Sequence, residues 1–512
     1  MIETQRPVTG KDFFDREEIL ERLLKTEKNY ALIGFRKTGK TSILFNFRRR
    51  VETSLVSYTY ILFSETEYSF LLKFINNILA TYLRSKSMEI KYFEDSLESF
   101  NELTRETVKI NPEISDLILQ IKDNLGKDIS NTFISLAFDL PEKLADDKFI
   151  ILLDEFQVLA NFKPRFLDIF RQKLQEQRKT RYIITGSIVG MMKEILENES
   201  VPLFGHFEII PIGNFDYRTA RRFILRNVKL NELHLNSLLC FTGGHPYYLS
   251  VIMSRMLNKP LNRSSLIDSI RETLFEPNGE LYIYFKETLE EMFRKRNMSR
   301  YFQILKAISL GRHRAKDICS FVSIPLSTIP PYLDFLIFIE LISRSKEGYY
   351  IRDPTLDFWL RSCHRVQESS ILDVQEKLNY FEEKIHELFR LIKSELGKAR
   401  ESQIREIFSM KGFTVSSGYL EGEEFDLVAR KNNKLILGEC RNKNITLRSV
   451  INFIRKIKKV ERIHKVSGKI LFSFLGITEK SKKLCVENKI DVWDIDRINR
   501  ERRNLELQPI TL

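Results

Sequence analysis

Gly34-Phe35-Arg36-Lys37-Thr38-Gly39-Lys40-Thr41 is the segment of this 512-residue sequence with the clearest structural meaning. The apolar run Tyr30-Ala31-Leu32-Ile33 precedes it and predicts a β-strand, and apolar residues at helical spacing follow it from Ile43 to Val51. A segment that joins a strand to a helix and ends in Gly-Lys-Thr is typical of a phosphate-binding loop. The sequence therefore predicts an α/β core with a P-loop.

Each part of this loop has an expected role in binding a nucleotide. The glycines let main-chain amides turn toward one point, where the amides and the N-terminus of the next helix hold the β-phosphate. Lys40 is expected to reach the β- and γ-phosphates, and the Thr41 hydroxyl is placed to bind Mg²⁺. We therefore expect ATP or ADP with Mg²⁺ as cofactors, held by Gly34, Lys37, Thr38, Gly39, Lys40, Thr41 and Ser42.

Two later strands are predicted to end beside this loop. The run Phe149-Ile150-Ile151-Leu152-Leu153 predicts a strand buried on both faces, and Asp154-Glu155 follows it. Asp154 is expected to bind Mg²⁺, usually through water, and Glu155 to polarise the water that attacks the γ-phosphate. The strand Tyr182-Ile183-Ile184 ends in Thr185-Gly186-Ser187, so Ser187 is expected to sense the γ-phosphate.

Length and composition indicate several folded domains. A chain of 512 residues exceeds one hydrophobic core, and 43% hydrophobic with 29% charged residues excludes a disordered chain. Another strand of the first domain is expected from Tyr58 to Phe63. The net charge of +13 permits a polyanionic partner, although a lysine-rich surface is also common in thermophile proteins.

Cysteine usage and hydropathy favour a cytoplasmic protein. The N-terminus has no apolar signal region and no window approaches eighteen apolar residues, so we expect neither secretion nor a membrane partner. The five cysteines contain no C-x-x-C pair, which argues against a disulfide framework and a zinc site: Cys240, Cys319, Cys363, Cys440 and Cys485.

Six motifs occur in order between residues 1 and 365: Phe14-Asp15-Arg16-Glu17, the loop 34–41, Leu152-Leu153-Asp154-Glu155, Gly186-Ser187, Pro202-Leu203-Phe204-Gly205 and Thr242-Gly243-Gly244-His245-Pro246. Together they resemble the archaeal ATPase family, a branch of the signal-transduction ATPases with numerous domains (STAND) that is allied to the AAA+ class. The resemblance implies that Arg16 lies near the adenine and that His245 and Pro246 belong to a helical lid that closes over the nucleotide. Where the family commonly has arginine, this chain has His206, so the source of a transition-state arginine stays open and slow turnover is expected.

The pattern after the P-loop core, residues 1–213, predicts four further parts. We expect a helical lid at 214–297, a winged helix at 298–365, a connecting helix at 366–396 and a nuclease-like α/β domain at 397–512. The third helix of the winged-helix module has no Lys or Arg between Pro325 and Leu341. Because phosphate contacts need cations, a structural or switching role is favoured over base reading.

The C-terminal region contains a second candidate site. Strands are predicted at Glu424-Phe425-Asp426-Leu427-Val428 and at Leu435 to Arg441, and a hairpin would bring Asp426 beside Glu439. This resembles the restriction-endonuclease-like fold, whose signature is an acid followed by acid-x-lysine. The resemblance implies that Asp426 and Glu439 bind a metal ion, but Arg441 stands where the catalytic lysine belongs. An active nuclease and a degenerate domain that binds without cutting therefore both stay open.

Basic residues indicate the partner of this region. They follow one predicted helix and the chain beyond it, which favours binding of DNA or RNA: Arg448, Arg455, Lys456, Lys458, Lys459, Arg462 and Lys465, then Arg497, Arg500, Arg502 and Arg503. We expect an ATPase that acts as a nucleotide switch for this domain. The alternatives are a nucleotide-bound scaffold or regulator and an ATP-dependent nuclease, and a homo-oligomer is compatible with each.

Overall fold

The computed structural model describes residues 6–51, 55–90, 96–125, 129–163, 165–197, 203–257, 259–260, 263–293, 296–368, 400–441, 444–474, 476–505, 507 and 510. The chain divides into two compact units. The first comprises Met1–Val228, Phe241–Leu261 and Asp268–Ser370, and the second comprises Lys229–Cys240, Asn262–Ile267 and Ile371–Leu512.

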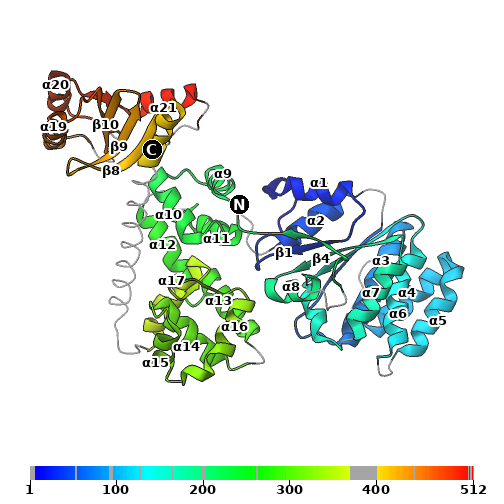
Figure 1. The fold of residues 1–512 in the computed structure, drawn as a ribbon. Helices are drawn as coiled ribbons and strands as arrows, with labels where there is room; N and C mark the ends of the chain where they lie inside the picture. The colour runs from blue at the N-terminus through cyan, green and yellow to red at the C-terminus, as the bar shows by residue number, and fades with distance from the viewer. Residues whose placement is uncertain are drawn as a thin grey trace. The chain divides into compact units, whose positions relative to one another are not determined.

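A five-stranded parallel sheet forms the centre of the first unit (Figure 1). Its order is β2-β3-β4-β1-β5, and all neighbouring pairs are parallel. Strands β1 and β3 are buried along their whole length, as their continuous apolar sequences predict. The strands are β1 (Tyr30–Ile33), β2 (Leu55–Tyr60), β3 (Phe149–Asp154), β4 (Thr180–Gly186) and β5 (Glu208–Pro211). Because β4 lies between β1 and β3, the carboxyl ends of these three strands are adjacent.

Helices cover both faces of this sheet. On one face Leu23 and Phe47 of the first two helices pack against Leu32 and Leu152. The other face carries a larger, phenylalanine-rich core contributed by the next six helices. The helices are α1 (Glu17–Lys25), α2 (Lys40–Arg50), α3 (Glu67–Ser85), α4 (Leu97–Ile110), α5 (Ser115–Asn124), α6 (Asn131–Leu144), α7 (Arg165–Glu176) and α8 (Val189–Glu197), with short 3₁₀ turns at η1 (Gly10–Asp12), η2 (Pro112–Ile114) and η3 (Phe156–Asn161).

Five helices follow the sheet. The Asp216 side chain accepts a hydrogen bond from the main-chain N of Thr219 and so caps the first of them. Pro246 occupies the first turn of the third, where its missing N–H costs no hydrogen bond. The helices are α9 (Tyr217–Asn227), α10 (Glu232–Thr242), α11 (Pro246–Met256), α12 (Arg263–Leu274) and α13 (Glu280–Met292).

Four further α-helices, a short 3₁₀ turn and a β-hairpin complete the described part of the first unit. The two strands of the hairpin are antiparallel, with Ser343 opposite Tyr350. The elements are α14 (Met298–Ser309), α15 (Ala315–Val322), η4 (Leu326–Thr328), α16 (Pro330–Phe338), β6 (Ile342–Arg344), β7 (Tyr349–Ile351) and α17 (Pro354–Glu368). Beyond Glu368, the connecting helix predicted at 366–396 lies outside the described residues.

The second unit contains another five-stranded sheet, in the order β12-β11-β10-β9-β8. Strands β8, β9 and β10 are antiparallel neighbours, whereas β11 pairs parallel with β10 and β12. A helix over 400–410 and α21 pack on one face, and α19 and α20 on the other. The elements are β8 (Thr414–Leu420), β9 (Glu423–Lys431), β10 (Lys434–Arg441), α19 (Leu447–Glu461), β11 (Gly468–Ser473), α20 (Glu479–Glu487), β12 (Asp491–Trp493) and α21 (Ile495–Asn504).

Two sequence-based expectations are tested directly by these elements. The strand predicted at Tyr58–Phe63 is displaced, because β2 begins at Leu55 and ends at Tyr60. Within the described residues no single helix is long and apolar enough to cross a membrane, and one helix pair, Ala315–Val322 with Leu326–Phe338, meets the length and composition criteria only when joined across a bend of 105°.

Candidate nucleotide site

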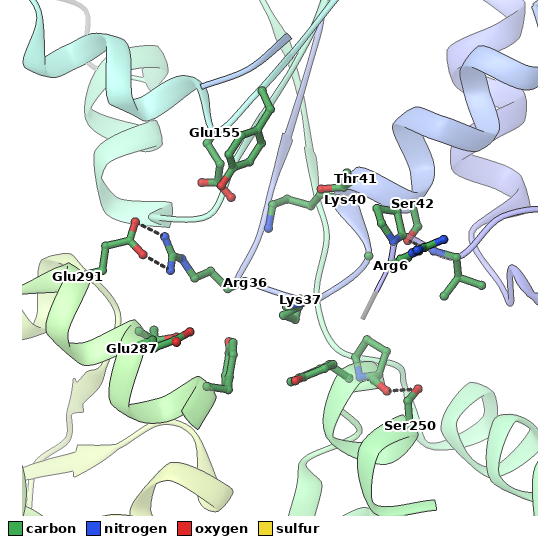
Figure 2. Close-up of a pocket in the computed structure, with 18 residues that line it drawn as sticks. Arg6, Arg36, Lys37, Lys40, Thr41, Ser42, Glu155, Ser250, Glu287 and Glu291 are labelled. Atoms are coloured by element: carbon green, nitrogen blue, oxygen red, sulfur yellow. Dashed lines mark hydrogen bonds and ion pairs between the residues drawn. The ribbon is translucent and has the colours of Figure 1, made fainter. Parts of the chain in front are cut away.

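A cavity of about 420 Å³ opens at the carboxyl edge of the first sheet (Figure 2). The phosphate loop, the chain before η1, and helices α11 and α13 surround it. Its lining residues are Arg6, Pro7, Val8, Arg36, Lys37, Gly39, Lys40, Thr41, Ser42, Tyr60, Glu155, Pro246, Tyr247, Ser250, Tyr284, Glu287, Thr288 and Glu291. The volume and the mixture of cations, hydroxyls and aromatic rings suit a nucleotide.

The two loop glycines are required for different reasons. Gly39 has φ +100°, a left-handed conformation that favours glycine. A Cβ on Gly34 would lie 1.9 Å from the carbonyl oxygen of Ile212, so the close approach of the chain after β5 excludes a side chain there. The loop backbone can therefore turn its amides toward the cavity.

Lys40 is buried beneath the loop. Its ammonium donates hydrogen bonds to the carbonyl oxygens of Gly34 at 2.7 Å and Phe35 at 2.6 Å. Burial lowers the pKa of Lys40 to about 8, although the Glu155 and Asp154 carboxylates oppose the shift. A phosphate group at this position would add a further anion that favours the charged ammonium.

Thr41 and Asp154 form a pair of oxygen ligands suited to Mg²⁺. The Thr41 hydroxyl donates to Asp154 Oδ2 at 2.7 Å, the Tyr58 hydroxyl donates to the same oxygen at 3.0 Å, and Thr185 donates to Oδ1. Burial, then the neighbouring Glu155 carboxylate, raises the pKa of Asp154. The described residues contain no group of three or more His, Cys, Asp or Glu side chains placed to hold a metal ion. Mg²⁺ on a nucleotide needs only one or two protein ligands, so this pair fits.

Glu155 is held at the edge of the cavity by two neighbours. Its backbone adopts a left-handed conformation with φ +61°, and its Oε2 accepts hydrogen bonds from Ser187 Oγ and Gln157 Nε2, both at 2.5 Å. Ser187 is therefore a contact of Glu155, and it lines a second, smaller cavity of about 200 Å³ rather than the larger one. Glu155 faces the larger cavity from the tip of β3.

His245, which the sequence predicts to belong to a lid, contacts the loop from behind. Pro246 lines the larger cavity, whereas His245 lines the smaller one. His245 Nε2 lies 3.1 Å from the carbonyl oxygen of Arg36, and its ring stacks on Tyr248 with centroids 3.8 Å apart. Burial lowers the pKa of His245 to about 3, so the ring is neutral and Nε2 is the donor to that carbonyl.

Other predicted residues lie elsewhere. Arg16 is not among the lining residues, because its guanidinium donates to the carbonyl oxygen of Gly213 and lies 5.4 Å from the Phe215 ring centroid. Thr38 is buried, and its hydroxyl donates to the Phe35 carbonyl oxygen at 2.8 Å. Gly34 contacts Lys40 through its carbonyl oxygen, which accepts a hydrogen bond from the ammonium. Pro246 was predicted, but no sequence pattern indicated the other lining residues: Tyr247 and Ser250 of α11, those of α13, and Arg6, Pro7, Val8, Arg36 and Tyr60.

The predicted hairpin of β9 and β10 is present, and it holds Asp426 against the backbone of β10. The two strands pair as far as Gly438 opposite Leu427, one residue short of Glu439 and Asp426. Asp426 Oδ2 accepts a hydrogen bond from the main-chain N of Cys440 at 2.8 Å. Arg441 donates to Glu439 Oε2 within the same strand.

A lysine far along the chain reaches the same acid. Lys456 on α19 donates to Glu439 Oε1 at 2.6 Å and to the carbonyl oxygen of Glu424 at 2.8 Å. Both oxygens of the buried Glu439 are thus bound by cations of the protein itself. Because both of its oxygens are already paired with cations, Glu439 as arranged does not fit a metal ion. The metal-binding role of Asp426 and Glu439 therefore stays a prediction.

No protein-family model matches the chain, and no curated protein matches it. Among solved structures, a Walker-type ATPase of Pyrococcus abyssi is similar, with 23% identity and a TM-score of 0.52 over 70% of this chain and 100% of that chain. The chain has a P-loop ATPase fold over that part. The Aeropyrum pernix ORC2 protein with bound ADPNP and ADP is more distant, with 12% identity and a TM-score of 0.43 over 70% of this chain and 98% of its own. The P-loop ATPase fold is thus shown by the similarity to the Pyrococcus abyssi protein.

Proposed function

We propose that the chain binds ATP and ADP with Mg²⁺ and hydrolyses ATP as a nucleotide switch. The observation that carries this proposal is the convergence of Lys40, Thr41 and Glu155 on one cavity of about 420 Å³ at the carboxyl edge of the sheet. The similarity to a Walker-type ATPase supports it at the level of the fold.

Each group that lines or adjoins the cavity has a separate proposed role in binding or hydrolysis. Main-chain amides of the loop and the Lys40 ammonium would hold the β- and γ-phosphates. Thr41 and Asp154 would hold Mg²⁺, which neutralises phosphate charge when bound. Glu155, kept in place by Ser187 and Gln157, would accept the proton of the attacking water. Pro7, Pro246 and Tyr247 offer apolar surface to the base.

Nucleotide-induced thermal stabilisation tests the binding step. The full chain should melt at a higher temperature with Mg²⁺ and ADP, because a ligand that binds the folded state stabilises it. Lys40→Ala should abolish this shift. Lys25→Ala removes an exposed lysine that pairs with Glu21 on α1, and it should keep the shift. An undiminished shift in Lys40→Ala would refute the site.

We propose as a second function that the second unit binds nucleic acid. Arg448, Arg455 and Arg462 are exposed and follow one another at intervals of seven residues, so they share one side of α19 and its C-terminal extension. Lys458 is also exposed on α19, and Lys465 is exposed in the chain that follows the helix. A row of cations of this kind suits a phosphate backbone.

Salt-dependent binding by the full chain tests this second function. Changing Arg448, Arg455 and Arg462 together to Gln should weaken DNA or RNA binding and reduce the slope of log affinity against log salt by about three. A matched triple change of exposed lysines on α20, Lys480, Lys482 and Lys483 to Gln, should have a smaller effect. If the triple arginine variant still binds DNA or RNA with the wild-type salt dependence, the interface lies elsewhere. Mg²⁺-dependent cleavage of DNA or RNA by the wild type that is lost in Glu439→Gln would establish the nuclease alternative.

A further inference from the structure

Arg36 occupies the third position of the phosphate loop, where the motif allows any residue. Its guanidinium forms a two-pronged ion pair with Glu291 near the end of α13. Nη1 donates to Oε2 at 2.6 Å, and Nη2 donates to Oε1 at 2.7 Å. A helix 255 residues away in sequence therefore fixes the orientation of a loop side chain.

The guanidinium is directed at Glu291 and lies in the same cavity as the groups that would surround the γ-phosphate. Figure 2 shows the side chains of Arg36, Lys40 and Glu155 directed into the same part of the cavity. Burial opposes ionisation of Arg36, but the Glu291 ion pair and the Glu155 carboxylate outweigh it and raise its pKa, so the side chain stays charged.

Two of the other cations that line the cavity lie away from Glu155. Four described lining residues are Arg or Lys. Lys37 lies with its ammonium 4.9 Å from the Tyr247 ring centroid, and Arg6 lies beside Ser42, across the loop from Glu155 (Figure 2). Arg36 and Lys40 remain on the side of Glu155, and Lys40 already has its proposed role in holding the β- and γ-phosphates.

The ion pair leaves Arg36 able to bind a phosphate. A guanidinium has five N–H donors, and Glu291 accepts from two of them. Three donors stay available on a group that is already oriented, so little side-chain entropy is lost when they are used. This is the arrangement that stabilises charge on a transferring phosphoryl group.

We propose that Arg36 is a catalytic residue that stabilises the γ-phosphoryl group during ATP hydrolysis within its own chain, and that Glu291 is its positioning residue. The assignment rests on the proposed ATPase function. In the reaction the oxygen of water bonds to the γ-phosphorus, and the bond from that phosphorus to the β,γ-bridging oxygen breaks with its electron pair on ADP. Glu155 accepts a proton of the water. Arg36 donates to the γ-phosphoryl oxygens, and the products are ADP and inorganic phosphate.

Single-turnover hydrolysis with measured nucleotide affinity tests the assignment in the full chain. Arg36→Gln keeps a donor toward Glu291 but removes the charge. It should bind Mg·ATP within about threefold of the wild type, yet hydrolyse it at least about 100-fold more slowly. It should also lose the tighter binding of ADP with fluoroaluminate, a transition-state mimic, over ADP alone. Glu291→Gln should slow hydrolysis about tenfold and leave the affinity unchanged.

The chain offers a matched control in a second two-pronged ion pair. Arg50 on α2 donates to both oxygens of Glu17, at 2.6 Å and 3.0 Å, and lies outside the cavity lining. Arg50→Gln should leave hydrolysis unchanged. A mixture of Arg36→Gln with Glu155→Gln should stay inactive, because each chain lacks one essential group.

Several results would overturn the assignment. The first is hydrolysis by Arg36→Gln at close to the wild-type rate, and the second is loss of ATP binding in that variant. The third is recovery of activity in the mixture of Arg36→Gln with Glu155→Gln, which would place the arginine in trans. Should Arg36→Gln fail to fold, Arg36→Lys keeps the charge without the fork and should be about tenfold slower, and a wild-type rate would contradict us. A wild-type protein that neither binds nor hydrolyses ATP would refute the proposed function itself, whereas binding and turnover that are independent of Arg36 refute only this inference.

Discussion

At the residue scale, the arrangement around Glu155 decides what the cavity can do. One of the two carboxylate oxygens of Glu155, Oε2, accepts hydrogen bonds from both Ser187 and Gln157. Its backbone is in a left-handed conformation that costs a non-glycine residue free energy and that persists only when the surroundings fix it. The chain thus holds one acid in a fixed position at the edge of the larger cavity.

Glu155→Gln should keep Mg·ATP binding and slow hydrolysis by about 100-fold or more, since it removes the proton acceptor while retaining the shape. Equilibrium binding and single-turnover phosphate release measure the two steps separately. Asp168→Asn on the exposed side of α7 serves as the control. Equal turnover by Glu155→Gln would place the general base on another residue.

The sequence predicted the central residues of this cavity but not its walls. Lys40, Thr41, Asp154 and Glu155 could be found because each follows directly on a strand or loop whose position in a parallel sheet is fixed. Arg36 and Glu291 could not be paired, because their contact depends on how α13 packs. Ser187 was placed at the correct strand tip, but its partner Gln157 lies in a 3₁₀ turn that no pattern predicts.

At the scale of elements, continuous apolar runs predicted β1, β3 and β4 well. The prediction for β2 was displaced because Ser57 and Thr59 are buried in the strand, whereas the apolar run Ile61-Leu62-Phe63 lies beyond its end. Burial of hydroxyls is not visible in a sequence. The predicted lid residues at the start of α11 are a further example, since His245 packs behind the loop whereas Pro246 lines the larger cavity.

His245 should make the first unit sensitive to acid. Its pKa is about 3 in the folded chain, against about 6.5 when unfolded, so below pH 6.5 only the unfolded chain takes up the proton. Stability should therefore fall as the pH falls from 6.5 toward 3, by up to about 1.4 kcal/mol per pH unit. His245→Gln keeps a donor for the Arg36 carbonyl and should show a smaller loss.

Melting temperatures at pH 7 and pH 5 measure this difference. His313→Gln is the matched control, because His313 also contacts a main-chain carbonyl, that of Tyr349 at 2.9 Å, but is only half-buried. Identical acid sensitivity of the wild type and His245→Gln would show that another group causes the loss.

At the scale of the whole molecule, a series of contacts leads from the phosphate loop to α17. His245 binds the Arg36 carbonyl and stacks on Tyr248, whose hydroxyl donates to Asp353 Oδ2 at 2.7 Å. Asp353 Oδ1 accepts from the main-chain N of Thr355 and Leu356 at the start of α17. A change in the loop therefore has a continuous set of contacts through which it can act on this helix.

The two proposed functions together predict that nucleic-acid affinity differs between the ATP-bound and the ADP-bound chain. By linkage, nucleic acid should change the ratio of ATP to ADP affinity by the same factor. Titrations of DNA at fixed salt, with each nucleotide in excess over Glu155→Gln protein, measure the difference. Tyr248→Phe removes the hydrogen bond to Asp353 and should reduce it while retaining nucleotide binding. Equal affinities with ATP, ADP and no nucleotide would contradict coupling.

The most direct test is phosphate release from Mg·ATP by the full chain and by Lys40→Ala, measured at one protein concentration after each preparation has been stripped of nucleotide. If the cavity at the phosphate loop is an ATPase site, the wild type releases phosphate with Mg²⁺ present, stops when EDTA removes the metal, and Lys40→Ala releases none above background. Equal release by the wild type and Lys40→Ala, or wild-type release that EDTA does not affect, would contradict the account.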